Sequence, residues 1–302
     1  MQRFSVIITT FNRVDTLPRA AESVLCQEGV DLELIVVDDG STDATSSYLT
    51  TISDPRVVTT RRDNGGLSAA RNTGIARASG DWTTFLDDDD VALPGWLFAF
   101  ANLVDDRTGL VCCGAEYGTS AGRLLGVALP RPMGVMFGHQ TALFLAGTFA
   151  CRTDLLHAVG GYDERLTCSH QTELAMRLMP PMLERGLRIR STNRAHLRIE
   201  RRDANERPMS NPAALYHGTR VLLEKHRDRF AQHRFERASS YGVLGVSAAR
   251  LEHWSEARSA LLTSARAEPL NARRWIRLAA ACCPPLARRA WRTADYESQV
   301  PA

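Results

Sequence analysis

Short apolar runs alternate with helical segments through the first hundred residues of this chain, and this alternation restricts the fold most. The runs that read as strands are residues 4–10, 34–37, 57–60 and 83–86. Nearly continuous β-branched runs are typical of parallel strands that helices cover on both faces. The pattern predicts an α/β fold with a doubly wound, mostly parallel, Rossmann-like sheet and right-handed crossovers.

Capping and turn residues set the expected ends of the helices. The first helix is expected to end at Gly29, and the second to begin after a cap at Thr42 or Asp43. The third should span residues 67–78, after the Gly65-Gly66 break. Pro94 is expected in the first turn of the fourth.

Polar motifs follow three of the four strand runs. They are FNR at residues 11–13, DDGS at residues 38–41 and DDDD at residues 87–90. Ligands of doubly wound sheets bind beyond the carboxyl ends of the strands. The three motifs should therefore meet at one sheet edge, and their convergence indicates a ligand site more strongly than any one of them.

Four consecutive aspartates repel one another, and burying them unpaired is costly. A divalent cation removes that cost. Carboxylate oxygens suit Mg²⁺ or Mn²⁺, which also bind substrate phosphates. The alternative is an acidic loop that only caps the next helix. The position of the run after an apolar strand, beside two other polar strand ends, favours the metal site.

Two further features suit a nucleotide. One carboxylate of Asp38-Asp39 can accept the N–H of a pyrimidine imide or of guanine, while the other holds a ribose hydroxyl or the turn. The alternative is a turn that caps the next helix, and both can be true. Arg71 can place a guanidinium against a diphosphate, or it can be a surface arginine.

Four segments share their motifs, order and spacing with a known family: FSVIITTFNR (4–13), ELIVVDDGSTD (33–43), NGGLSAARNTGIARASGDWTTFLDDDD (64–90) and VGGYDERL (159–166). They resemble the inverting family-two glycosyltransferases, which have the GT-A fold. The resemblance is specific over residues 4–100, weaker to about 200 and absent beyond 212. It implies transfer of a sugar from a nucleotide diphosphate sugar to a hydroxyl acceptor on a polysaccharide, glycolipid or metabolite.

The resemblance also implies roles for individual residues. The donor-binding positions would be Thr9, Phe11, Arg13, Asp38, Asp39, Gly65, Gly66, Arg71, Asp87 and Asp88. Asp89 would be the most direct ligand of Mn²⁺ or Mg²⁺, with Asp87 beside it. Because the carboxylate of Asp39 suits uracil, thymine or guanine, the donor can be UDP-, dTDP- or GDP-linked.

The general base of the family is not at its expected place. Aligned on the turn at 160–164 and on the helix that follows, the family's Glu-Asp pair becomes His170-Gln171, and an amide cannot act as a base. His170 can replace it, because imidazole titrates in the right range. Glu173, three residues along the helix, is a second candidate, and Asp163 is a further one. Otherwise transfer is lost or weak, and the chain is a nucleotide-sugar-binding protein whose helical tail docks a partner.

The chain is expected to divide at residue 211. Residues 1–211 would form the GT-A domain, with a donor half (1–105) and an acceptor half (106–211), and residues 212–302 an α-helical extension. Residues 245–269 read as two antiparallel helices around His253-Trp254. Arg201 and Arg202, in a polar segment, can close over the diphosphate as a lid, or lie in a solvated loop.

Charge and cysteine usage limit the partners and the compartment. A net charge of +3 is too small to indicate nucleic acid. Arginines among tryptophans at 272–292 suit peripheral contact with an anionic membrane, although helix packing explains the same residues. Seven cysteines without metal-binding spacing indicate a reducing compartment. With no signal-peptide core and no run of eighteen apolar residues, the sequence predicts a cytoplasmic protein, or one peripheral to the inner face of the membrane.

Overall fold

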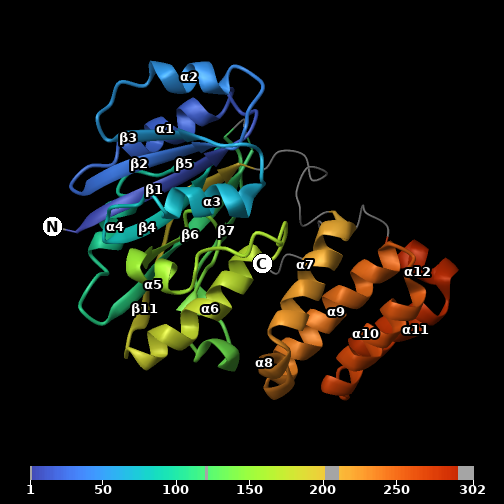
Figure 1. The fold of residues 1–302 in the computed structure, drawn as a ribbon. Helices are drawn as coiled ribbons and strands as arrows, with labels where there is room; N and C mark the ends of the chain where they lie inside the picture. The colour runs from blue at the N-terminus through green and yellow to red at the C-terminus, as the bar shows by residue number, and fades with distance from the viewer. Residues whose placement is uncertain (1, 120–121, 201–210, 292–302) are drawn as a thin grey trace. The chain divides into compact units, whose positions relative to one another are not determined.

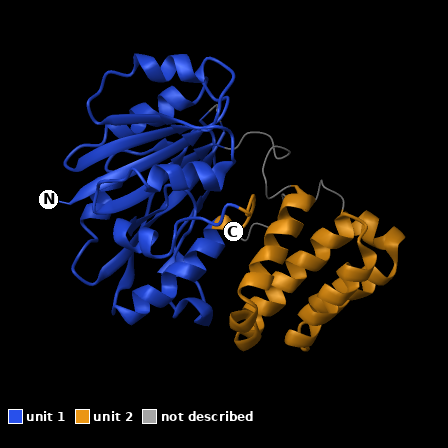
Figure 2. Ribbon diagram, viewed as in Figure 1, with its two compact units in different colours: residues 1–164, 171–202 blue, residues 165–170, 203–302 orange. Residues whose placement is uncertain are grey.

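The computed structural model describes residues 2–119, 122–200 and 211–291. The chain forms two compact units, residues 1–164 with 171–202, and residues 165–170 with 203–302 (Figure 2). The first unit is an α/β structure and the second consists mainly of helices (Figure 1).

A nine-stranded sheet forms the centre of the first unit, in the order β3-β2-β1-β4-β10-β6-β11-β5, with β7 paired to β6. Four neighbouring strands are parallel: β1 (Arg3–Thr10), β2 (Asp31–Asp38), β3 (Val57–Arg61) and β4 (Trp82–Asp87). These are the four strands that the apolar runs predict. The mostly parallel α/β fold is therefore confirmed.

The rest of this sheet mixes directions. Its strands are β5 (Val91–Ala92), β6 (Thr108–Gly118), β7 (Leu124–Ala128), β10 (Phe149–Arg152) and β11 (Arg188–Glu200). Strand β10 is antiparallel to both β4 and β6, so β6 runs in the same direction as β4. Strand β11 is parallel to β6. A separate pair, β8 (Arg131–Pro132) with β9 (Thr141–Ala142), flanks the 3-10 turn Val135–Phe137.

Both faces of the parallel strands are buried, which explains their continuous apolar runs. Val6 and Ile8 of β1 join one core cluster with Leu17 of α1. Ile7, on the opposite face, packs on Gly74 of α3, where an added Cβ would lie 2.5 Å from its side chain. The helices of this unit are α1 (Leu17–Leu25), α2 (Thr45–Thr51), α3 (Leu67–Ile75), α4 (Trp96–Ala101), α5 (Thr153–Ala158) and α6 (His170–Glu184).

Several predicted helix ends are wrong. Helix α1 ends four residues before Gly29, and α3 ends at Ile75 rather than at residue 78. Helix α4 begins after Gly95, whose φ of 79° places the cap one residue beyond Pro94. The cap of α2 is Ala44, because the Asp43 carboxylate instead accepts the Thr45 N–H at 2.9 Å in a local turn.

The second unit contains α7 (Pro212–Lys225), α8 (Arg227–Gln232), α9 (Arg234–Arg250), α10 (Trp254–Ala267), α11 (Ala272–Cys282) and α12 (Pro284–Ala290). The predicted helix pair around His253-Trp254 is confirmed as α9 and α10. Gly245 lets them approach, because a Cβ there would lie 2.5 Å from Leu261. None of the helices within the described ranges is both long and apolar enough to span a membrane.

Candidate functional site

The carboxyl ends of three neighbouring strands align at one edge of the sheet. Thr10 of β1 is in register with Asp38 of β2, and Thr9 is in register with Asp87 of β4. The DDGS and DDDD motifs therefore lie on either side of the carboxyl end of β1, and the FNR motif follows β1 itself. The structure thus brings the predicted donor and metal motifs together at one edge.

The Asp39 carboxylate joins the DDGS turn to the Gly65-Gly66 loop. It accepts the Gly65 and Gly66 N–H groups at 3.1 and 2.8 Å and the Arg62 guanidinium at 2.9 Å. A carboxylate offers about four lone-pair sites, so these three donors leave room for one more N–H. Asp39 is buried, so this remaining site is suited to a base rather than to bulk water.

Asp38 stabilises the turn itself. Its carboxylate accepts the Ser41 N–H at 2.8 Å and the Ser46 hydroxyl at 2.6 Å, and Arg61 lies 3.3 Å away. Burial alone raises the pKa of Asp38, but the hydrogen bonds from Ser41 and Ser46, with the charge of Arg61, lower it overall. Asp38 is therefore a charged residue that holds the loop in shape.

Phe11, Asn12 and Arg13 follow β1 at the same edge. The Phe11 ring is 45% exposed, which leaves it accessible to a planar ligand, and Arg13 is half-buried. The Asn12 side chain accepts the Thr42 N–H at 2.7 Å and so ties this motif to the DDGS turn. Asn12 was expected only as part of the FNR motif, and its φ of 54° belongs to a region that asparagine tolerates better than most residues.

Arg71 is buried at the centre of the site, so its interpretation as a surface residue is wrong. Only 2% of it is exposed, and Nη2 donates to Oδ1 of Asp87 at 2.8 Å. The guanidinium carbon lies 5.7 Å from the centre of the Phe85 ring and 5.3 Å from that of Tyr162. Nη1 has no hydrogen-bond partner within the described part of the chain. A buried donor without a partner fits an anionic ligand such as a diphosphate.

The four aspartates have different environments. Asp87 ends β4 and pairs with Arg71, whereas Asp90 is buried and accepts the Glu200 N–H at 3.2 Å. Burial raises the pKa of Asp88 to about 7, and the charges of Asp89 and Asp87 add to this. Asp90 therefore has a structural role, and the crowded charge belongs to residues 87–89.

A divalent cation would relieve this crowding. Across residues 2–119, 122–200 and 211–291, no group of three His, Cys, Asp or Glu side chains is arranged to hold a metal. Mg²⁺ and Mn²⁺ commonly need only one or two carboxylates, because water and substrate phosphates complete their coordination. Asp89 and Asp87 fit such a site.

The raised pKa of Asp88 predicts a pH-dependent stability. Because its folded pKa exceeds the ordinary 3.8, the folded state binds the proton more tightly than the unfolded state. Without a divalent cation, stability should fall by about 2.5 kcal/mol between pH 5 and pH 8, at about 1.4 kcal/mol per pH unit below pH 7. Urea denaturation in EDTA measures this. Asp88→Asn should flatten the dependence of stability on pH. An unchanged slope in that variant would show that Asp88 is not the group responsible.

Gln171 lies close to the buried guanidinium. The Tyr162 hydroxyl donates to Oε1 of Gln171 at 2.9 Å, and the ring of Tyr162 faces Arg71. One aromatic ring therefore separates Gln171 from the Arg71–Asp87 pair. Gln171, which aligns with the family's base, therefore contacts Tyr162 at the site, but its amide cannot act as a base.

Asn72 fixes the turn that carries Tyr162. Its Oδ1 accepts the Tyr162 N–H at 2.7 Å, and its Nδ2 donates to the Tyr162 carbonyl and to Glu164, both at 2.9 Å. Gly161 has φ of 66°, and a Cβ there would lie 2.4 Å from Asn72 Oδ1. Sequence reasoning missed Asn72 and Tyr162. The glycine pair at 160–161 was the available signal, because a left-handed turn permits this close approach.

Glu173 is not placed as a base should be. It is fully buried, and Arg177 binds its carboxylate through contacts of 2.6 to 2.9 Å. Arg177 also donates to the Val159 carbonyl at 2.6 Å. A general base must reach the proton that it removes, so this ion pair argues for a structural role. His170 is half-buried at the start of α6, and Asp163 is half-buried.

Glu173→Gln should therefore act on stability. Replacing one partner of a buried ion pair costs about 3 kcal/mol, because the other charge is left uncompensated. Chemical denaturation measures the loss, and Glu184→Gln, near the exposed end of the same helix, is the control. If Glu173→Gln instead keeps wild-type stability and abolishes transfer, the residue has a catalytic role.

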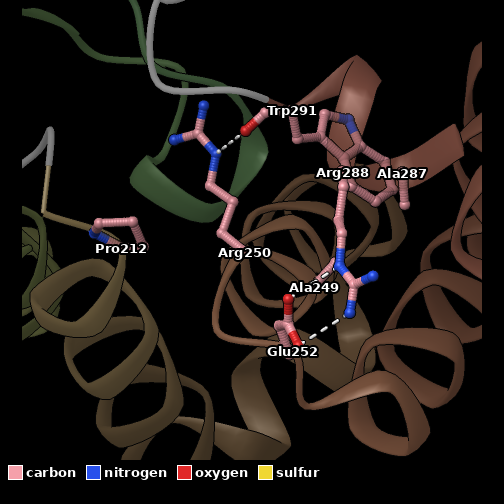
Figure 3. A pocket seen from close by; sticks show the side chains of 7 residues that line it. All are labelled: Pro212, Ala249, Arg250, Glu252, Ala287, Arg288 and Trp291. Atoms are coloured by element: carbon pink, nitrogen blue, oxygen red, sulfur yellow. Dashed lines mark hydrogen bonds and ion pairs between the residues drawn. The ribbon is translucent and has the colours of Figure 1, made fainter. Parts of the chain in front are cut away.

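The predicted lid residues, Arg201 and Arg202, lie outside the described residues. A hollow in the second unit contains none of the predicted site residues (Figure 3). Glu252 pairs with Arg288 at 2.8 and 3.0 Å, and Arg250 donates to the Trp291 carbonyl at 3.2 Å. Glu252 and Arg288 therefore neutralise each other and Arg250 binds a backbone carbonyl, so the sheet edge of the first unit remains the candidate site.

Comparisons with known proteins agree with this geometry. The family described as "Glycosyl transferase family 2" matches residues 5–155. The chain is similar to the succinoglycan biosynthesis protein ExoO of Rhizobium meliloti (strain 1021), at 47% identity over 89 residues, which are 29% of this chain. That match spans only 26% of the relative's length.

Two solved structures share the fold. S. aureus TarS 1-349, in complex with UDP-GlcNAc, aligns with a TM-score of 0.63 at 19% identity, over 97% of this chain and 93% of that one. The mannosyltransferase PcManGT from Pyrobaculum calidifontis, in complex with GDP-Man and Mn²⁺, aligns with a TM-score of 0.60 at 18% identity, over 96% and 87%. The GT-A fold is therefore confirmed, including a helical C-terminal region.

Proposed function

Because the chain belongs to the family-two glycosyltransferases, we propose that it transfers a sugar from a nucleotide diphosphate sugar to a hydroxyl acceptor, with inversion and with a divalent cation. The strongest support is the buried Arg71. Its Nη2 donates to Asp87, and its Nη1 lacks a hydrogen-bond partner among the described residues. The similarity to a succinoglycan biosynthesis protein supports an acceptor on a polysaccharide, and the UDP-GlcNAc and GDP-Man bound to the two structures of the same fold support a UDP- or GDP-linked donor. A dTDP-linked donor suits Asp39 equally.

The described residues suit distinct steps. Asp39 and the Phe11 ring bind the base, while Nη1 of Arg71 donates to the diphosphate. Asp89 and Asp87 would hold Mn²⁺ or Mg²⁺, which would supply positive charge against the departing diphosphate. The acceptor oxygen attacks the anomeric carbon from the face opposite the diphosphate, and the sugar–phosphate bond breaks. His170 is the first candidate to take the acceptor proton, because Glu173 is held by Arg177, and Asp163 is the second.

One observation favours a second function. Gln171 occupies the family's base position and accepts a hydrogen bond from Tyr162. A chain without a base there can bind the donor and transfer slowly or not at all. It would then act as a nucleotide-sugar-binding protein whose helical residues 212–302 dock a partner.

A thermal-shift panel distinguishes these functions. UDP, dTDP and GDP sugars with Mn²⁺ should raise the melting temperature by roughly 5 °C for the matching nucleotide at saturation. EDTA should remove most of this shift. Donor hydrolysis by the best binder then supports transfer, whereas binding without hydrolysis supports the second function. No shift with any nucleotide would contradict both.

We also propose a cytoplasmic location, peripheral to the inner face of the membrane, with residues 272–292 as a contact. Helices α11 and α12 expose apolar side chains in this region. The exposed fractions are 41% for Trp275, 66% for Ile276 and 53% for Leu286. Arginines such as Arg273 and Arg289 are exposed beside them, which suits an anionic surface.

A further inference from the structure

Strand β7 presents an apolar surface in the first unit. The exposed fractions are 56% for Leu124, 42% for Leu125 and 52% for Val127, and Leu129 just beyond the strand is 43% exposed. Strand β7 pairs only with β6 among the described strands, so its other edge is open. Exposed apolar patches of this kind usually mark an interaction surface.

The pairing with β6 explains why so many apolar side chains are exposed. The register shifts between Tyr117 and Gly118, which are opposite Gly126 and Leu124, so Leu125 forms a bulge. A bulge bends the strand and interrupts the strict alternation of faces. Both Leu124 and Leu125 are therefore exposed, whereas Ala128 is opposite Ala115, a residue of the core.

The charges around this surface are positive. Arg123 and Arg131 bracket the apolar residues, and both are exposed. Within the described ranges neither arginine forms an ion pair, and Glu116, which is opposite Val127 on β6, pairs with Arg198 at 3.1 Å. Two copies of β7 would bring four arginines together, which disfavours self-association. An anionic lipid surface is attractive to the arginines and accepts the leucines.

The surface lies in line with the candidate active site. One row of paired residues joins Val127 to Glu116 of β6, Glu116 to Arg198 of β11, and Arg198 to Val91 of β5. Val91 directly follows Asp90. Three strand spacings of about 4.8 Å make this distance roughly 14 Å. A bilayer at β7 would therefore lie close to the edge that holds the aspartates.

We propose that the β7 surface, defined as Arg123, Leu124, Leu125, Val127, Leu129 and Arg131, docks on an anionic phospholipid bilayer. This contact is separate from the one proposed for residues 272–292. The leucines and valine enter the interface between headgroups and acyl chains, while the two arginines bind lipid phosphates. Its relation to the active site rests on the proposed function and suits a lipid-linked hydroxyl acceptor, but docking itself does not require transfer.

Vesicle flotation of the full chain tests the proposal without any donor. Vesicles of phosphatidylglycerol with phosphatidylcholine should bind the wild-type protein, and phosphatidylcholine alone should not. Leu125→Ser with Val127→Thr, and separately Arg123→Gln with Arg131→Gln, should each weaken binding by about tenfold or more. Val58→Thr is the matched control, because Val58 is a 40% exposed valine on the opposite edge strand β3, and it should bind normally.

Further measurements separate the alternatives. Melting temperatures must show that the variants are folded, and Trp275→Ser with Ile276→Ser reports the contribution of α11.

Equal binding by the wild type and both β7 variants would overturn the proposal, as would absence of wild-type binding. A dimer in solution that Leu125→Ser with Val127→Thr dissociates, without vesicle binding, would assign the surface to a second copy instead. Nucleotide binding should be unchanged in the β7 variants, so failure here is distinguishable from failure of the proposed function.

Discussion

Asp87→Ala should lose sugar transfer and about 3 kcal/mol of folding free energy together. The stability loss follows from Arg71, which is 2% exposed and has Asp87 as its ion-pair partner at 2.8 Å. Removing the partner of a buried charge leaves that charge uncompensated. Transfer should fall by at least about a hundredfold, because the proposed carboxylate ligand of the cation and the orientation of Arg71 are lost together.

Asp89→Ala is the matched control, two residues along the same acidic run. It should lower transfer to a similar extent but change stability by less than about 1 kcal/mol, since removing one carboxylate also reduces the repulsion in the run. Urea denaturation and donor turnover measure the two effects. If Asp87→Ala proves as stable as Asp89→Ala, the ion pair with Arg71 contributes little to folding.

Gln171→Glu should raise transfer by about a hundredfold, at the lower end of what a positioned general base contributes. The substitution places a carboxylate where Tyr162 donates its hydroxyl at 2.9 Å, one aromatic ring away from Arg71. Single-turnover transfer from the donor identified in the thermal-shift panel measures the gain. Gln171→Met, of similar volume without a basic group, should stay at the wild-type rate or below it.

The companion variant is His170→Ala. If it abolishes transfer while Gln171→Glu has no effect, His170 is the base and the Gln171 position has lost that role. If neither change alters a measurable rate, the base lies elsewhere, and Asp163 is next to be replaced. An absence of transfer in every variant, despite donor binding, would favour the nucleotide-sugar-binding function.

The donor half of the fold was predictable because burial leaves a continuous signal. The strand run at 4–10 corresponds to β1, and each motif at a strand end lies where the parallel arrangement requires. Strands β6 and β11, with 11 and 13 residues, were less evident, because glycines interrupt the apolar run of β6 and arginines and other polar residues make up most of β11.

The details of the site were less accessible to sequence reasoning. Asn72 and Tyr162 are 90 positions apart, and hydrogen bonds between distant side chains produce no periodicity along the chain. The ion pair between Glu173 and Arg177 has the i,i+4 spacing expected on a helix, but that spacing does not show that the Glu173 side chain is fully buried. Family alignment places His170-Gln171 at the base position, and the structure adds that Gln171 accepts a hydrogen bond from Tyr162.

The Asn72 contacts also set a rule for recombining this protein with its relatives. Neighbouring residues of α3 serve two different parts of the chain, because Arg71 holds the end of β4 and Asn72 holds the turn at 160–164. A chimera that exchanges residues 106–211 for those of another family member therefore inherits a foreign turn at this joint. Such exchanges should succeed where the incoming turn keeps a glycine at position 161 and a backbone N–H at position 162 that can donate to Asn72. Residues 106–211 are thus exchangeable as a block only together with Asn72, the residue on α3 that binds this turn.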